Sequence, residues 1–199
     1  PKVQYIEDQK PMQVTQLPRV RGVEGVDWAM PLYKGQIRAR LENGQFQNCQ
    51  FFGVDDATLV GGPVEMVQGR LEDLKNADAV IVDEISASGR LARAPETPGG
   101  APRPLRVGDI LELNDHRALV VGLARLTRSF QNQPTIYTTY SRSITMAPKE
   151  RRNLSYILVK ARPGQDLAEL CRRITEQTGL AAYTSTEFKW MTVNYFLRF

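Results

Sequence analysis

The chain has 199 residues, of which 42% are hydrophobic and 24% are charged. This composition supports one large core or two small ones and excludes intrinsic disorder. The net charge is +4, but the basic residues are spread along the chain, and their densest group, Lys149, Arg151 and Arg152, is interrupted by Glu150. A nucleic-acid surface needs a basic stripe with interleaved aromatic residues, so we expect no nucleic-acid partner.

The N-terminal quarter predicts a helix followed by a hairpin. Hydrophobic residues in 9–20 recur at roughly helical spacing, which favours a helix kept short by its prolines. Residues 26–33 are predicted to be extended. Apolar and polar residues alternate in 35–41 and again in 45–54, on either side of Asn43-Gly44. This dipeptide is the strongest short-range signal for a hairpin turn, so we expect the two segments to pair.

The middle of the chain is rich in strand signals. Residues 79–82 form a short β-branched run that ends at two acidic residues. Two further apolar runs, 110–113 and 117–121, flank the turn dipeptide Asn114-Asp115 and predict a second hairpin.

Turn-rich segments interrupt these strands. Gly61-Gly62-Pro63 and Ala147-Pro148 break the pattern and mark two boundaries, and residues 134–140 between them alternate as a short strand. The segment Ala94–Pro104 holds four prolines and two glycines in eleven residues. It is too turn-rich for a regular element, so we expect a mobile surface excursion.

The C-terminal part holds the clearest helix. Residues 154–160 predict a strand, and Asp166 is placed to cap a helix whose apolar residues in 167–174 fall at i, i+3, i+4 and i+7. Gly179 is the expected C-terminal stop, and residues 180–183 are predicted to resume as a strand. Together these elements predict a β-α-β unit.

The elements at the two chain ends are each too small to close a core alone. If the two ends pack together, with the β-rich middle section inserted between them, each can bury the apolar side chains of the other. This arrangement also keeps the chain ends close. The predicted fold is therefore α+β with two lobes. Residues 1–61 and 150–199 form a discontinuous α/β lobe, and residues 62–149 form an inserted β-rich lobe.

The chain carries no residue pattern typical of a catalytic or metal site. The single histidine, His116, excludes a histidine-rich zinc site, and neither a Gly-x-Ser-x-Gly elbow nor a glycine-rich phosphate loop with lysine occurs. Neighbours on a strand point to opposite faces, so Asp55-Asp56 and Asp83-Glu84 do not predict acid/base couples. Asp83 is instead expected to anchor an arginine or cap a turn. We expect no enzyme, no cofactor and no metal.

The cysteines and the chain ends leave alternatives open. Free buried thiols are the default interpretation of Cys49 and Cys171, and a disulfide between them stays possible in an oxidising compartment. The chain opens Pro-Lys-Val without an initiator Met, a signal peptide or any membrane-spanning apolar run, and we expect an excised or mature segment. The aromatic and cationic segment 188–199 is typical of the approach to a transmembrane helix or of a terminal segment docked on the core.

Six segments, taken in order, resemble a known family. They are GVDDATLVGGP (53–63), ADAVIVDE (77–84), LRVGDILELNDHRALVVG (105–122), QPTIYTTY (133–140), LSYILVKARPGQDLAELCRRI (154–174) and TSTEF (184–188). Each motif is weak alone, but their order and spacing are specific and span nearly the whole chain. The chain resembles the extracytoplasmic domain of FtsX-like ABC transporter permeases of the MacB and DevC types.

The resemblance implies a periplasmic domain between the first two transmembrane helices of a bacterial inner-membrane export permease. It implies a porter-like α/β lobe from both chain ends and an inserted β-rich lobe. Such a permease works as a dimer with a separate or fused ATPase, and this domain transmits ATP-driven motion and docks an adaptor protein, the exported substrate or both. The transmembrane helices and the ATPase are absent from this chain. Segment 94–104 matches no motif of the family.

Exposed aromatic residues favour protein interfaces. We therefore expect partner contacts at Phe130, Gln131, Pro134, Tyr137 and Tyr140, with core packing as an equal alternative for these residues. Two other functions stay open. One is a free-standing periplasmic module that binds a lipid or peptide in an apolar pocket between the lobes, and the other is a hydrolase, against which the missing catalytic set argues.

Overall fold

The computed structural model describes residues 12–95, 97, 99–126, 133–148 and 153–196, with 192–196 described by their backbone alone. The chain divides into two compact units, residues 1–31 with 153–199, and residues 32–152. The first unit is thus discontinuous, but its limits differ from the predicted lobes, because residues 32–61 lie in the second unit. The assignment of a porter-like and an inserted lobe stays a prediction.

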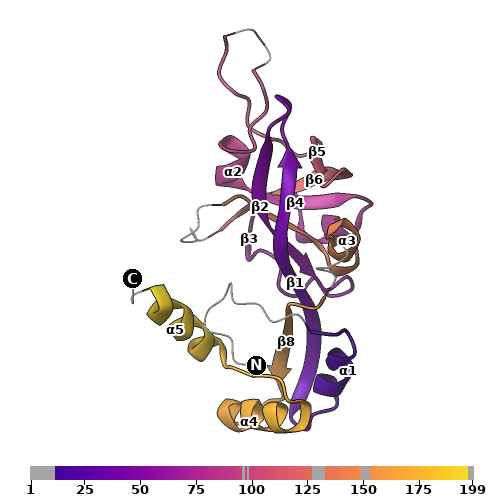
Figure 1. Ribbon diagram of the computed structural model, residues 1–199, viewed down its shortest axis with the longest axis vertical. Helices are drawn as coiled ribbons and strands as arrows, with labels where there is room; N and C mark the ends of the chain where they lie inside the picture. Colours follow the sequence, from indigo (N-terminus) through magenta and orange to yellow (C-terminus); the bar gives the residue numbers. More distant parts are fainter. Residues whose placement is uncertain (1–11, 96, 98, 127–132, 149–152, 197–199) are drawn as a thin grey trace. The chain divides into compact units, whose positions relative to one another are not determined.

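The first unit holds few elements (Figure 1). They are α1 (Gln16–Arg21), the start of β1 (Val26–Arg40), β8 (Tyr156–Ala161), α4 (Leu167–Thr178) and α5 (Ser185–Phe196). Its core combines Val20, Ala29, Leu170 and Ile174 with neighbouring apolar side chains. The helix predicted within 9–20 is shorter than expected, because α1 begins only at Gln16.

Helix α4 forms as predicted from its caps. The Asp166 carboxylate accepts hydrogen bonds from the backbone N–H groups of Ala168 (2.8 Å) and Glu169 (3.1 Å). Gly179 ends the helix with a left-handed φ of 75°, a conformation that glycine adopts more easily than residues with a side chain. The strand predicted at 180–183 is wrong, because these residues join no sheet. The side chains of Leu180 and Ala182 pack on the core of the first unit instead.

The second unit is built on a sheet that closes on itself (Figure 1). Strand β1 pairs with β2, and the ring continues through β7, β4, β6 and β5 back to β1. Strand β3 pairs with β6 outside this ring. The strands are β2 (Phe46–Val54), β3 (Glu65–Gln68), β4 (Ala79–Asp83), β5 (Ile110–Leu113), β6 (His116–Arg125) and β7 (Thr135–Thr139). Closure pairs the edges that an open sheet would expose.

Both predicted hairpins are confirmed. Strands β1 and β2 pair antiparallel around the turn at Asn43-Gly44, and β5 pairs with β6 around Asn114-Asp115. Asn114 and Asp115 both adopt positive φ angles, 45° and 63°. This is the backbone of a type I′ turn, whose twist matches the flanking strands.

The inside of the ring is the largest core of the second unit. The ring strands alternate, so that Ile37 and Ala39 face inward while Arg38 and Arg40 face solvent. Tyr33 and Phe51 meet edge to face inside, with their centroids 6.3 Å apart. Leu91 and Leu105, from the connection between α2 (Glu84–Ser88) and β5, join the same core. The remaining elements of the unit are η1 (Leu71–Lys75) and α3 (Tyr140–Met146).

Helix α3 lies against β2 because Gly53 has no side chain. A Cβ at this position would lie 2.0 Å from Ser143 Oγ and 2.5 Å from Ser143 Cβ. We expect Gly53→Ala to lower the free energy of unfolding of the second unit by about 1–3 kcal/mol, the usual cost of overpacking. Urea unfolding would measure it. Gly44→Ala is a poor control because Gly44 has a positive φ, so Ala57→Gly in the exposed turn serves instead, and an equal effect of the two changes would contradict the packing argument.

Candidate interaction surface

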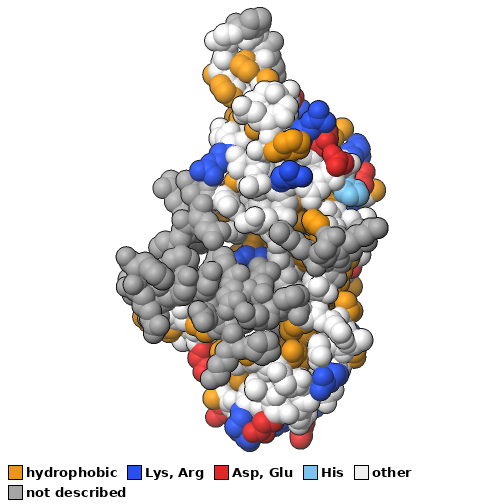
Figure 2. Space-filling view, in the orientation of Figure 1, with side chains coloured by type: hydrophobic (Ala, Val, Ile, Leu, Met, Phe, Trp, Pro, Cys, Tyr) orange, Lys and Arg blue, Asp and Glu red, His pale blue; other side chains and the backbone are white. Residues whose placement is uncertain are grey.

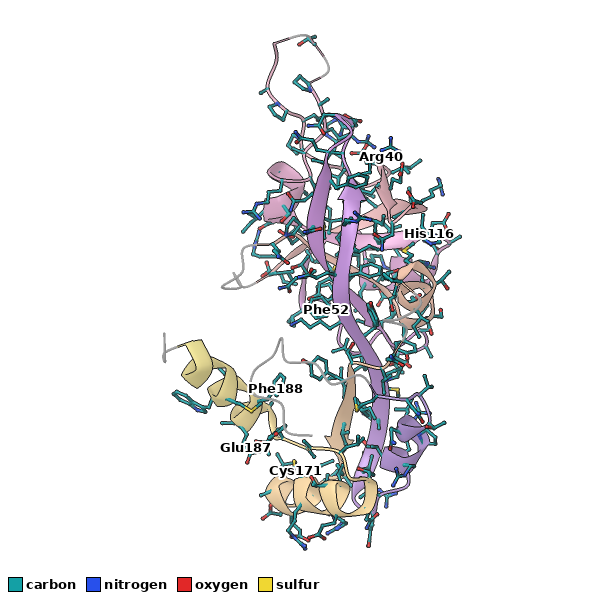
Figure 3. The ribbon with its side chains drawn as sticks, in the orientation of Figure 1. Arg40, Phe52, His116, Cys171, Glu187 and Phe188 are labelled. Atoms are coloured by element: carbon teal, nitrogen blue, oxygen red, sulfur yellow. The ribbon has the colours of Figure 1, made fainter. Side chains whose placement is uncertain are left out.

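The residues predicted to contact a partner do not form one exposed patch among the described residues. Phe130 and Gln131 lie outside the described residues, and Pro134 is buried beside β7. Tyr137 is half-buried and stacks on Phe52 (labelled in Figure 3), with ring centroids 5.2 Å apart, and burial raises the pKa of Tyr137 to about 12. Tyr140 packs against the core of the ring. Tyr137 and Tyr140 therefore have packing roles, and partner contact at these positions stays a prediction.

In both acidic pairs, aspartate side chains accept hydrogen bonds from backbone N–H groups. The Asp83 carboxylate accepts from the N–H groups of Ser86 (2.8 Å) and Thr135 (2.7 Å), so it caps α2 and ties it to the start of β7. Asp55 accepts from the Thr58 N–H (2.9 Å). Asp56 accepts from the Ser141 N–H (3.2 Å) in the first turn of α3. The expected capping role of Asp83 is confirmed.

The described residues contain no cluster of three potential metal ligands. Cys49 and Cys171 are both free. Cys49 faces the inside of the ring, and burial raises the pKa of its thiol to about 12. Such a thiol is a poor nucleophile at neutral pH. His116 is exposed at the start of β6.

None of the described helices has both the length and the apolar character needed to cross a membrane.

The most organised polar cluster lies at the base of the proline-rich segment, and we call it the clamp: Glu42, Arg93, Arg103 and Asp109. Arg103 donates two hydrogen bonds to the Asp109 carboxylate, both at 3.0 Å. Arg93 pairs with Glu42 in the β1–β2 turn and lies 3.7 Å from Asp109 Oδ1 through its Nε. The Ala94 N–H donates to Glu42 (2.8 Å), and Arg93 and Arg103 also form an isolated β-bridge. The clamp therefore joins three separate segments.

The clamp is partly shielded from water, which strengthens its charge pairs relative to exposed ones. The side chains of Arg93, Arg103 and Asp109 are 22%, 18% and 18% exposed. Hydrogen bonds from the Ala94 amide and the Arg93 guanidinium lower the pKa of Glu42. Burial alone would raise the pKa of Asp109, but hydrogen bonds from Arg103 and the Arg106 amide outweigh it and lower that pKa.

We expect Asp109→Asn to lower the stability of the second unit by about 1–3 kcal/mol at pH 7, because it removes hydrogen bonds to a charged group. The pKa values of Glu42 and Asp109 are lowered by folding. The stabilisation is therefore complete above their ordinary values, 4.5 and 3.8, and is lost as the pH falls through the lowered values. Urea unfolding between pH 7 and pH 3 would show the variant converging on the wild type. Glu176→Gln on α4 is the exposed control, and a difference independent of pH would contradict this role.

Sequence reasoning missed the clamp. It treated the segment 94–104 as a mobile excursion. The available signal was the position of Arg93 and Arg103, which lie at the two ends of a segment with no other basic residue between them. The acidic partners Glu42 and Asp109 are far from one another in sequence, and only the paired strands bring them together.

Solved structures with a similar fold include the extracellular domain of a transporter and the periplasmic region of MacB. The extracellular domain of the noncanonic ABC-type transporter YknZ from Gram-positive bacteria matches with a TM-score of 0.61 and 11% identity, over 89% of this chain and 90% of that one. The periplasmic region of MacB from Actinobacillus actinomycetemcomitans matches with a TM-score of 0.61 and 18% identity, over 94% and 84%. A domain of a putative permease from Porphyromonas gingivalis matches with a TM-score of 0.53 and 18% identity, over 89% and 73%.

At these identities the structures establish a common fold, and they confirm the predicted α+β class. No curated protein sequence matches the chain. The family model described as MacB-like periplasmic core domain matches residues 3–177, which is most of the chain. The resemblance read from the sequence motifs is therefore confirmed, and this chain belongs to the MacB-like periplasmic core domain family.

Proposed function

We propose that this chain is the periplasmic domain of a bacterial inner-membrane ABC export permease, in which it docks an adaptor protein and passes ATP-driven motion to it. The observation that carries the proposal is the family match over residues 3–177. The partners of the full permease are a second permease copy, an ATPase subunit that acts through the membrane part, and the adaptor. The domain itself has no catalytic role.

Strand β1 supports the mechanical part of the proposal. The boundary between the compact units falls between Pro31 and Leu32, so one continuous strand begins in the first unit and ends in the second. Within the second unit, ladder hydrogen bonds to β2 hold residues 33–40 of β1, and a paired strand is stiffer than a loop. Motion applied to the first unit is transmitted along this strand.

Adaptor binding tests the proposal. The full permease dimer, reconstituted with its ATPase in lipid nanodiscs, is titrated with the adaptor encoded beside the gene, and binding and ATP hydrolysis are recorded together. We expect saturable binding and an adaptor-dependent change in the ATPase rate. No binding, by the isolated domain or by the reconstituted dimer, would contradict the proposal. Native mass spectrometry of the isolated domain that showed a retained lipid or peptide would support a free-standing binding module instead.

A further inference from the structure

The ring of strands closes at a short join between β1 and β5, which we call the seam. Among the described residues, two pairs form it, Ala39 with Leu113 and Arg40 with Glu112. Both strands are held more firmly by their other neighbours, since eight residue pairs join β1 to β2 and four join β5 to β6. When the seam parts, each of its strands therefore keeps a partner.

A second short join, between β4 and β7, also has two residue pairs in the described part of the chain, but it is buried. Its residues Ile81, Val82 and Ile136 are 0% exposed. The buried hydroxyl of Thr138 reinforces it by donating to the Ala79 carbonyl of β4 (2.9 Å). A hydrogen bond shielded from water is stronger than an exposed one, so this join is the firmer of the two.

The seam, in contrast, lies at the surface. The Arg40 and Glu112 side chains form an ion pair across it, with Nη1 and Oε1 3.3 Å apart, and they are 54% and 41% exposed. Figure 2 shows acidic and basic side chains at the surface around His116, which starts β6 and is labelled together with Arg40 in Figure 3. Exposed ion pairs stabilise little, and exposed backbone hydrogen bonds are typical of regions that open locally. The seam is therefore the join of the ring that opens at the least cost.

Asn114 extends the seam at one end. Its N–H donates to the Arg38 carbonyl (3.0 Å), and its side-chain Oδ1 accepts from the Arg38 N–H (3.1 Å). Its Nδ2 donates to the Met146 carbonyl at the end of α3 (3.2 Å). An amide suits this position because it accepts and donates at once. The side chain thus continues the pairing between β1 and β5 past the end of β5.

The clamp holds the other end of the seam. Arg93 pairs with Glu42, in the turn after β1, and its Nη2 donates to the Ile110 carbonyl at the start of β5 (2.9 Å). Side chains therefore bridge β1 and β5 both before and after the two backbone pairs. Such contacts form and break without rearrangement of the strands themselves.

We propose that the seam is a latch, at which β1 and β5 part and rejoin while the other strand pairs of the ring stay intact. Opening admits water and solutes to the inside of the ring, where Cys49 lies next to the seam. The Ala39 backbone N–H donates a hydrogen bond to the Cys49 sulfur, and both residues belong to the ring core together with Leu113. The Cys49 side chain is fully buried in the closed ring, so its reaction with a thiol reagent reports opening. This inference goes beyond the proposed function, because the latch belongs to the ring with or without a partner.

The test measures how fast a thiol reagent labels Cys49 in the 199-residue chain, in a Cys171→Ser background and at several urea concentrations below the unfolding transition. Opening of the latch exposes little surface, so we expect the labelling rate to rise much less steeply with urea than global unfolding does. Asn114→Gly removes the side-chain hydrogen bonds at the seam but keeps the turn, since glycine accepts the φ of 45° found there. It is expected to speed labelling by about tenfold. Asp115→Gly, at the neighbouring turn position with a φ of 63°, is the matched control and is expected to change the rate by less than about twofold.

Two further variants separate opening of the latch from global unfolding. Glu112→Lys breaks the ion pair at an exposed position, where folding is not at risk, and is expected to speed labelling by about twofold or more. Phe52→Ala lowers stability away from the seam and is expected to leave the labelling rate unchanged. Labelling that follows global unfolding, with its full urea dependence and with acceleration by Phe52→Ala, would overturn the latch and leave the proposed function intact. Wild-type labelling rates in both Asn114→Gly and Glu112→Lys would overturn it as well.

Discussion

Replacing Phe51 by alanine is expected to lower the free energy of unfolding of the second unit by about 3–5 kcal/mol, the usual cost of emptying a buried aromatic site. Phe51 is 1% exposed and packs edge to face on Tyr33 inside the ring of strands. The change would leave a cavity that the closed ring cannot collapse to fill, because its strands are paired on both sides. Urea unfolding followed by far-ultraviolet circular dichroism gives the value.

The neighbouring residue is the matched control. Phe52 lies next to Phe51 on β2, points to the opposite face and stacks on the half-buried Tyr137. Phe52→Ala is therefore expected to cost about 1–2 kcal/mol, through the lost aromatic pair and a smaller buried area. Equal losses for the two variants would contradict the assignment of Phe51 to the inside of a closed ring.

Replacing Asp83 by alanine is expected to lower the stability of the second unit by about 2–5 kcal/mol. The side chain is buried, and its two oxygens accept from two different backbone groups, those of Ser86 and Thr135. The alanine variant leaves both N–H groups without a partner in a region closed to water, and each such group costs about 1–3 kcal/mol.

The Asp83→Asn variant separates the contributions of the two hydrogen bonds that Asp83 accepts. An amide has one acceptor oxygen, so Asp83→Asn keeps one hydrogen bond and is expected to lie about halfway between the wild type and Asp83→Ala. Thermal unfolding of the three proteins provides the comparison. Asp83→Ala within about 0.5 kcal/mol of the wild type would show that these hydrogen bonds contribute little.

Local signals predicted the parts of the fold that depend on local chemistry. The turns at Asn43-Gly44 and Asn114-Asp115 and the capped helix α4 were readable because the residues that define them lie within a few positions of one another. Helix α3 was missed because its sequence, YSRSITM, has no apolar period. It is held by packing at Gly53 and by Asp56, which lies 85 residues away from Ser141.

The rest of the fold depends on contacts between segments that are far apart in the sequence. The ring depends on parallel pairing of β2 with β7 and of β4 with β6, and nothing in a strand's own sequence specifies its distant neighbour. This is why residues 32–61 were expected in the other lobe. The clamp has the same origin, since the strand pairing brings Glu42 and Asp109 to Arg93 and Arg103. The strand predicted at 180–183 had a suitable apolar run but joins no neighbouring strand.

Accessibility of the exposed residue Thr97 in living cells tests the central claim, that this chain is an extracytoplasmic domain of a membrane permease, most directly. Thr97→Cys is introduced into the full-length protein together with Cys171→Ser, and intact cells are treated with a maleimide that crosses the outer but not the inner membrane. Cys49 gives little background because its thiol is buried, with a pKa raised to about 12. The account predicts labelling in intact cells as rapid as after lysis. Labelling only after the inner membrane is broken would contradict it.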